Sequence, residues 1–550
     1  MRRWGDVARS GLALLATAAL IVSSAPPAAA APLSPRTYDG PAYSAQITSP
    51  PTGSGDQSKL WFHADAWWAM LLEPSGRAVR VFELMPDHTW RPTSAVVNPD
   101  AGDAGDARRD GDAVHVVNRR SDGTLYYVRL TFDPATRDYR AAPPVFVTDR
   151  GPRSPATIVK DSTGRLWVCY ATASEVVVLN STDGGLTWSL PALLATTGTG
   201  SDPEAASMEA FDAHIGILWT NRSTGTFEFA SHRDVDPPGV WAREQAKGGP
   251  TAGDRISLRR VEGTPSDTLV AAVKTSPGNQ GEAANLPLIE VLVRAPGGVW
   301  TSVPVSTVAD ALDQPVLSVD EETRTLYLFA SANGDIVSKQ ASLDDLTFLP
   351  GPGSMFVFGG DGRLAEPTAP RERVGSRSGV VILATDVRRV GYFHAEAPIV
   401  IDNPVPDPND VVAPEPPALL QGRAQGPTSV VLSWEEVVEA GRWSAGRDGL
   451  PVQGYVVLRD GDEIATVTTT YVRDQPRDED DAAAGTSVEY QVQAVDLAGN
   501  RSEPSRVVVD LPAADTGRTA GELVGLGLLG VALPVAAAAG YVTFRRRRPA

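Results

Sequence analysis

The side chains that most often carry nucleophilic or metal chemistry are rare in this sequence. The chain of 550 residues has a single cysteine, Cys169, and 6 histidines. Cys169 lies in the apolar run 166–170, where a lone cysteine is expected to be a buried small hydrophobic residue. No Cys/His spacing typical of zinc is present, and an intrachain disulfide is impossible. We therefore expect no metal, no other cofactor, and a fold stabilised by a large core.

Two adjacent aromatic residues, Trp67 and Trp68, are the candidates for stacking against a ligand such as a sugar ring. Neighbouring residues of a strand face opposite sides, so one of the two rings could be exposed. The alternative is structural, with one ring in the core and the other in a seam between sheets.

The most specific pattern is the eight-residue segment 181–188, which fits S-x-D-x-G-x-T-W at every defined position. In such a turn the aspartate accepts hydrogen bonds from nearby backbone N–H groups, and the glycine adopts a left-handed conformation. We expect a folding role at the turn between the two outer strands of a sheet. A degenerate copy at 342–348 has leucine in place of the glycine. The residues that define the motif are Ser181, Asp183, Gly185, Thr187 and Trp188.

The elements that must position these residues are short strands, rich in β-branched and aromatic side chains and separated by Gly, Asp, Asn and Pro. A strongly apolar strand recurs about every 45–55 residues, a period typical of repeat folds. Its copies are 60–62, 113–117, 166–170, 215–219, 269–273 and 326–329.

Each repeat ends on an aromatic residue that follows a turn. A strand-rich repeat of this length, present six or seven times, predicts a β-propeller, in which each small sheet hides its faces against its neighbours. The strand at 380–384 predicts an incomplete last unit, and residues 38–47 could supply the strand that closes the ring. The closing aromatics are Trp90, Tyr139, Trp188, Trp241, Trp300 and Phe348.

With the 181–188 motif as its main support, the segment 38–400 resembles the sialidase-like propellers that carry Asp boxes, also called bacterial neuraminidase repeats. The family's enzymes use three arginines to hold the substrate carboxylate, a Tyr–Glu pair as nucleophile, and an Asp as acid/base. No residue here matches that set. Arg255, for example, lies far downstream of the position expected for the first arginine. An active sialidase is therefore an alternative, not the main prediction.

A second domain follows at 418–511, after a Pro-, Asp- and Glu-rich linker at 401–417. Its alternating strands resemble a fibronectin type III domain. The alternation places Trp434, Tyr455 and Tyr490 in its core.

The two ends of the chain predict export and anchoring. Residues 1–31 have the basic, apolar and small-residue regions of a signal peptide. Residues 521–544 form an apolar span long enough for a transmembrane helix, and four arginines in the tail 545–550 predict a cytoplasmic C-terminus. The segment 512–517, ending in Thr516-Gly517, resembles a sortase sorting signal, which implies a cut between these two residues and a link to peptidoglycan. A plain single-span membrane anchor is the alternative.

The predicted fold class is therefore all-β: a six- or seven-bladed propeller and a fibronectin type III sandwich, with one C-terminal transmembrane helix. A net charge of −18 makes nucleic acid an unsuitable partner. We predict a cell-surface binding or adhesion protein that recognises an extracellular glycan or protein without catalysis. The alternatives are an exo-sialidase or other glycoside-processing enzyme, and a wall-linked scaffold without a specific ligand. An enzyme predicts several arginines and carboxylates at the propeller's central pocket, and a lectin predicts a shallow rim groove with exposed Trp or Tyr. A scaffold predicts neither.

Overall fold

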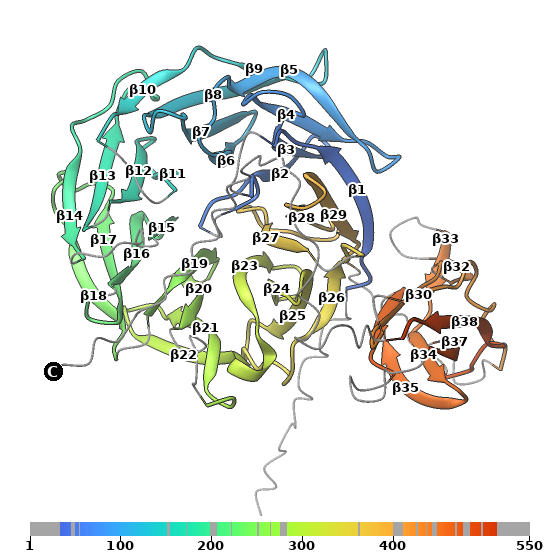
Figure 1. Ribbon diagram of the computed structural model, residues 1–550. Helices are drawn as coiled ribbons and strands as arrows, with labels where there is room; N and C mark the ends of the chain where they lie inside the picture. The colour runs from blue at the N-terminus through green and yellow to red at the C-terminus, as the bar shows by residue number, and fades with distance from the viewer. Residues whose placement is uncertain are drawn as a thin grey trace, which may run out of the picture.

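The computed structural model describes residues 33–513 except for short gaps, the longest being 198–205, 276–282, 400–410 and 477–484. Within this part, seven sheets of mainly four strands form a ring, and a smaller β-sandwich lies beside it (Figure 1). The ring is a seven-bladed β-propeller, with the first strand of each blade next to the central axis.

The first four blades each use consecutive strands, named here from the axis outwards. Blade 1 consists of β2 (Leu60–His63), β3 (Ala66–Leu72), β4 (Val79–Leu84) and β5 (Trp90–Asn98). Blade 2 consists of β6 (Asp106–Asp110), β7 (Ala113–Arg119), β8 (Leu125–Asp133) and β10 (Val145–Thr148), and β9 (Asp138–Ala141) also pairs with β8. Blades 3 and 4 consist of β11 (Thr157–Lys160), β12 (Leu166–Ala171), β13 (Glu175–Ser181) and β14 (Ala192–Thr196), and of β15 (Ala206–Phe211), β16 (His214–Asn221), β17 (Thr226–Arg233) and β18 (Ala242–Lys247).

The remaining three blades complete the circle. Blades 5 and 6 consist of β19 (Ala252–Val261), β20 (Thr268–Thr275), β21 (Pro287–Arg294) and β22 (Trp300–Thr307), and of β23 (Asp313–Asp320), β24 (Thr325–Ala332), β25 (Asp335–Ser342) and β26 (Ser354–Val357). Blade 7 consists of β27 (Leu364–Thr368), β28 (Val380–Asp386), β29 (Gly391–Ala397) and β1 (Arg36–Ala42).

The second strand of a blade is apolar along its length because neighbouring blades cover both of its faces. Every residue of β12 and of β28 is buried. A strand buried on both sides needs no alternation of polar and apolar residues, which explains the short apolar runs of the repeat. Five of the six runs named above lie in second strands. The exception is 60–62, which lies in the innermost strand β2.

The ring is closed by pairing the two ends of the propeller segment in one blade. Strand β1 pairs antiparallel with β29, and Tyr38 is opposite His394. Blade 7 is also tied to blade 1, because the buried hydroxyl of Tyr392 accepts a hydrogen bond from the backbone N–H of Leu72 at 2.9 Å. The incomplete unit expected near 380–384 is therefore completed by an N-terminal strand.

The sandwich packs two antiparallel sheets face to face, with a small hairpin at the side. Its core includes Trp434, Tyr455 and Tyr490, which are at most 6% exposed. The Tyr490 hydroxyl donates a hydrogen bond to Asp474 at 2.7 Å. The sheets are β30 (Gln421–Ala424), β31 (Val430–Ser433) and β36 (Tyr471–Asp474), and β35 (Asp462–Val467), β34 (Gly454–Arg459), β37 (Thr486–Val495) and β38 (Ser505–Leu511); the hairpin is β32 (Val438–Arg442) and β33 (Asp448–Pro451).

The sandwich contacts the propeller at blade 6, next to the closing strand β1 (Figure 1). Arg473 forms an ion pair with Asp335 at 2.8 Å. The ring of Tyr471 stacks on Phe358, with 5.4 Å between ring centroids. The same segment is linked to β1, because the backbone N–H of Phe358 donates to the hydroxyl of Thr37 at 3.0 Å. The second domain is thus docked on the blade edge where the ring closes.

The prediction of a transmembrane helix, and with it of a single-pass membrane protein, is corrected by the structure. Among the described residues no helix is long and apolar enough to cross a bilayer, and the helix found there is a three-residue 3-10 turn, Val308–Asp310. Within the described residues the fold class is all-β. The predicted span 521–544, the signal peptide 1–31, the tail 545–550 and the pair Thr516–Gly517 lie outside the described residues.

The link between blades 7 and 1 predicts the effect of Tyr392→Phe. This variant removes the acceptor of a buried backbone N–H, which lowers the free energy of unfolding by about 1–3 kcal/mol. Urea denaturation of the wild type and of the variant measures this loss in the free energy of unfolding. The half-buried Tyr126, changed to Phe as a control, should alter stability by less than about 0.5 kcal/mol. Equal stability of both variants would show that the Tyr392 hydroxyl is not needed.

Candidate functional site

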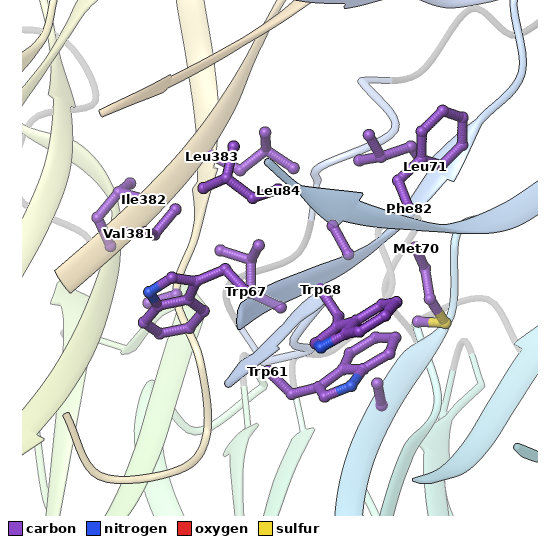
Figure 2. Close-up of a cluster of buried hydrophobic side chains, with 14 of the residues drawn as sticks. Trp61, Trp67, Trp68, Met70, Leu71, Phe82, Leu84, Val381, Ile382 and Leu383 are labelled. Atoms are coloured by element: carbon purple, nitrogen blue, oxygen red, sulfur yellow. The ribbon is translucent and has the colours of Figure 1, made fainter. Parts of the chain in front are cut away.

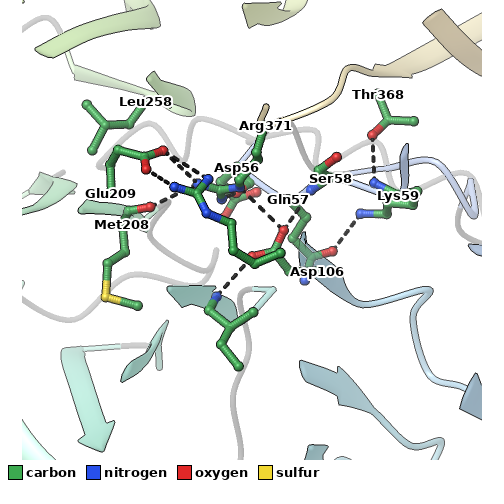
Figure 3. Close-up of polar contacts among 12 residues, drawn as sticks. Asp56, Gln57, Ser58, Lys59, Asp106, Met208, Glu209, Leu258, Thr368 and Arg371 are labelled. Atoms are coloured by element: carbon green, nitrogen blue, oxygen red, sulfur yellow. Dashed lines mark hydrogen bonds and ion pairs between the residues drawn. The ribbon is translucent and has the colours of Figure 1, made fainter. Parts of the chain in front are cut away.

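The centre of the propeller is occupied by a buried polar cluster that joins the inner strands (Figure 3). Asp106, at the start of β6, accepts hydrogen bonds from the backbone N–H groups of Ser58 at 2.8 Å and Ile158 at 2.9 Å. Ser58 lies just before β2 of blade 1, and Ile158 lies on β11 of blade 3. Asp106 also lies 3.4 Å from Nε of Arg371, which follows the inner strand of blade 7. One carboxylate thus connects four blades.

Glu209, on the inner strand of blade 4, is the second carboxylate of the cluster and is 2% exposed. It pairs with the guanidinium of Arg108, and Nη1 of Arg371 lies 3.8 Å from its Oε2. Nη1 of Arg371 also donates to the Met208 carbonyl at 2.9 Å. Burial would raise the pKa of Glu209, but the attraction of the two arginines outweighs burial and holds it below its ordinary value.

The segment that precedes β2 fills the rest of the centre. The side chain of Gln57 donates to the carbonyl of Ala156 at 2.8 Å, and the ammonium of Lys59 donates to Gln57 at 2.7 Å. Burial raises the pKa of Asp56 to about 7 and lowers the pKa of Lys59 to about 8. Arginines and carboxylates therefore converge on the axis, as expected for an enzyme, but they are buried and bonded to one another.

Sequence reasoning missed this cluster, although a signal for it exists. One small or acidic polar residue recurs once per repeat at the inner-strand position, and each copy is fully buried. A polar residue at a fixed point of an apolar repeat indicates a shared structural contact. The first five copies are Ser58, Asp106, Thr157, Ser207 and Ser257.

Beside the cluster, a pocket of about 410 Å³ opens between blades 2 and 3. Arg108, Arg109 and Lys160 line it together with Asp110 and the β11–β12 turn. Lys160 pairs with Asp110 at 2.5 Å, and Arg108 is committed to Glu209. The pocket is polar, but its charges already have partners.

A larger cleft of about 940 Å³ lies between blades 5 and 6. Its apolar surface comes from aliphatic side chains such as Val270, Val293 and Val303. Its walls are the turns β19–β20, β21–β22 and β23–β24, together with the segment 343–346 that follows β25. The cleft therefore combines an aliphatic surface with a polar margin, as ligand sites commonly do.

The margin of the cleft carries two arginines, each held by acidic side chains. Arg260 donates to Glu262 at 2.9 Å and lies 3.8 Å from Asp267. Arg324 contacts Asp344 at 2.7 Å. These side chains are between 12% and 49% exposed, so hydrogen-bond donors and acceptors stay available to a ligand.

Two residues of this cleft adopt left-handed backbone conformations that disfavour side chains. Arg324 has φ 51° and Leu346 has φ 48°. Leu346 takes the place that glycine has in the intact motif, where Gly185 has φ 92°. Thirteen other non-glycine residues of the described chain also have positive φ, so this conformation recurs along the chain and does not by itself mark the cleft.

The intact motif 181–188 lies between the two outer strands of blade 3, β13 and β14. Asp183 accepts hydrogen bonds from the backbone N–H of Thr187 at 2.9 Å and from its hydroxyl at 2.6 Å, and from the Ser181 hydroxyl at 2.8 Å. A Cβ on Gly185 would collide with the ring of Tyr127 in blade 2. Trp188 packs against the same ring, with 5.6 Å between centroids. The motif therefore also seals a seam between blades.

Trp67 and Trp68 are buried and point to opposite sides of blade 1 (Figure 2). Trp67, 6% exposed, lies near β28 and donates to the carbonyl of Ser378 at 2.9 Å. Trp68, fully buried, packs edge-on against Tyr139 of blade 2. The structure thus places these rings in the two seams that flank blade 1, and neither offers an exposed face to a ligand.

Two other residues singled out from the sequence, Cys169 and Arg255, both lie on strands of the propeller. Cys169 is fully buried in β12, and burial raises the pKa of its thiol above its ordinary range. Arg255 forms an ion pair with Glu366 at 3.1 Å. Across the part of the chain that the structure describes, no group of three or more His, Cys, Asp or Glu side chains could hold a metal ion.

Comparison with known sequences leaves the family open. No protein-family profile matches the chain. A stretch of 112 residues, 20% of the chain, is 34% identical to an alpha-amylase of Niallia circulans. The match spans 7% of the length of that alpha-amylase, so the activity of the whole enzyme does not transfer to this chain.

Solved structures with detectable similarity are proteins of several kinds. They include the polysaccharide lyase Uly1, with TM-score 0.38, 10% identity and coverage of 63% of this chain and 90% of the lyase. SapL1 lectin in complex with alpha methyl fucoside has TM-score 0.36, 13% identity and coverage of 55% and 97%. A mutant of AofleA from Arthrobotrys oligospora has TM-score 0.32, 10% identity and coverage of 66% and 87%. These low similarities assign neither a ligand nor a reaction.

The position of Asp106 predicts the consequence of Asp106→Asn. The variant leaves Arg371 without one of its two carboxylates and turns an N–H donor toward a backbone N–H, so unfolding free energy should fall by about 3–5 kcal/mol. Asp65→Asn, which removes an ion pair to Arg377 between exposed side chains, should change stability by less than about 1 kcal/mol. Similar denaturation midpoints for the two variants would contradict the bridging role.

The motif 181–188 predicts a pH-dependent stability contribution. Hydrogen bonds from Thr187 and Ser181 lower the pKa of Asp183 to about 2. A carboxyl whose pKa is lower in the folded state stabilises the fold fully at pH values above its unfolded-state pKa of about 3.9. This stabilisation is lost as the pH falls toward the folded-state pKa. The melting-temperature gap between wild type and Asp183→Ala should therefore be constant from about pH 8 to 5 and narrow below about pH 4. A gap that does not narrow would contradict the ionised hydrogen-bonded state.

Proposed function

We propose that the propeller is a non-catalytic glycan-binding domain and that the cleft between blades 5 and 6 is its binding site. The observation that carries this proposal is the 940 Å³ cleft, which joins an aliphatic surface to partly exposed arginine–carboxylate pairs.

The chemistry of the cleft suits a neutral sugar. Sugar hydroxyls both donate and accept hydrogen bonds, and Arg260 and Arg324 supply donors beside acceptors on Glu262, Asp267 and Asp344. The valines can contact the C–H faces of a ring. The two arginines are outnumbered by four acidic side chains, Asp345 being the fourth, which disfavours an anionic ligand.

The alternative, a glycoside-processing enzyme of the sialidase type, has less support. It requires open arginines and carboxylates around a substrate. Arg371 and Glu209 at the axis have side chains 0% and 2% exposed and are paired to each other or to near neighbours. Two resemblances stay predictions from sequence: that of 181–188 to Asp boxes and that of 418–511 to fibronectin type III domains. An extracellular glycan partner is likewise a prediction.

The proposal is tested by glycan-array screening of the purified chain, followed by calorimetric titration of the glycans that bind. The double variant Arg260→Ala/Arg324→Ala removes both donors and should weaken binding about tenfold or more, with little change in melting temperature. Arg140→Ala provides a matched control, because Arg140 is an exposed, carboxylate-paired arginine in blade 2. The control should bind like wild type.

Three results would decide against this function. No bound glycan, or equal binding by wild type and the double variant, would exclude the cleft as a glycan site. Chemical conversion of a bound glycan, followed by chromatography, would replace a binding function by an enzymatic one. Capture of a protein ligand that the glycans do not displace would favour a protein-binding surface.

A further inference from the structure

Arg259 is a buried cation without a matching carboxylate. It lies on β19, the inner strand of blade 5, and is 2% exposed. Its Nε donates to the carbonyl of Leu317 at 3.1 Å, and its Nη1 donates to the carbonyl of Leu258 at 2.9 Å. Its buried Nη2 has no hydrogen-bond partner among the described residues, and none of their carboxylates lies within ion-pair distance of the side chain.

The carboxylates nearest to Arg259 are already committed. Glu209 pairs with Arg108 and lies near Arg371, and Asp106 accepts two backbone hydrogen bonds and faces Arg371. Three guanidinium groups therefore share two carboxylates. Lys59, Asp56 and Glu372, whose carboxylate acts on Arg108, belong to the same cluster, but none of its carboxylates lies within ion-pair distance of Arg259.

An isolated buried charge is costly, and arginine rarely escapes the cost by losing its proton. Burial lowers the pKa of Arg259 to about 9, and the positive charges of Arg371 and Arg108 act in the same direction. At neutral pH the guanidinium thus remains charged. It needs an anion, and the protein groups around it supply none within contact.

Two further donors flank the same strand. Ser207 lies on β15 and Ser318 on β23, the inner strands on either side of β19. Both residues are fully buried, and their hydroxyl oxygens have no hydrogen-bond partner in the described chain. Because Nε of Arg259 reaches the carbonyl of Leu317, its side chain points toward the strand that carries Ser318.

We infer that Arg259 binds a small monovalent inorganic anion, such as chloride, at the propeller axis, with the hydroxyl of Ser318, on the strand toward which its side chain points, as an additional donor. The site is too buried for a carboxylate on a larger molecule, since Arg259 is 2% exposed. The negative charge of the anion offsets that of Arg259, whose Nη2 has no partner among the described residues. The anion is a structural ligand of the ring and is independent of glycan binding in the cleft.

Crystals grown with bromide in place of chloride test the site on the unaltered protein. We expect an anomalous-difference peak within hydrogen-bond distance of Nη2 of Arg259. A fully ordered crystal with no such peak, or with a water molecule at this position in the presence of bromide, would overturn the inference.

Thermal unfolding tests the same inference in solution. At constant ionic strength, replacing gluconate by chloride in the buffer should raise the melting temperature of the wild type by about 2 °C or more. Arg259→Met, which removes the charge but keeps a long apolar side chain, should abolish the dependence on chloride. Arg255→Met, on the same strand but paired to Glu366, should retain it. Persistence of the chloride effect in Arg259→Met, or its absence in the wild type, would contradict the site.

Discussion

The ring depends on polar contacts at its axis, and above all on the carboxylate of Asp106. A blade is a small sheet whose two faces are covered only by its neighbours, so apolar packing holds adjacent blades together but does not fix how the inner strands meet at the centre. Asp106 fixes this by accepting one backbone N–H from each side and by facing Arg371 of the last blade. Because the alternative is an unsatisfied buried charge, the contact tolerates little displacement.

The covering of exposed strand edges accounts for where the ring closes and where the second domain lies. Blade 7 takes its outer strand from the N-terminal side of the propeller, so closure joins residues more than three hundred positions apart, such as Tyr38 and His394. The sandwich contacts the neighbouring edge through Arg473 and Tyr471. A blade edge that would otherwise expose unpaired strand groups is thus covered by protein.

Arginine–carboxylate pairs occur in two different settings in this protein. At the axis, arginines and carboxylates satisfy one another in a closed interior, where an unpaired charge is expensive. At the cleft between blades 5 and 6, similar pairs are partly exposed and lie beside aliphatic surface. Side chains of one chemical type therefore build the ring in one place and present hydrogen-bonding groups to solvent in another.

The sequence by itself determined the strand-rich repeat, because burial of second strands on both faces requires apolar runs such as 166–170 at a regular period. It also determined the turn at 181–188, whose aspartate, glycine and threonine act on their own backbone. Only the tertiary structure decided the number of blades, the burial of Trp67 and Trp68, and the convergence of Asp106, Glu209, Arg259 and Arg371. Those contacts join residues from different repeats, and which side chains meet at the axis depends on how many blades close the ring.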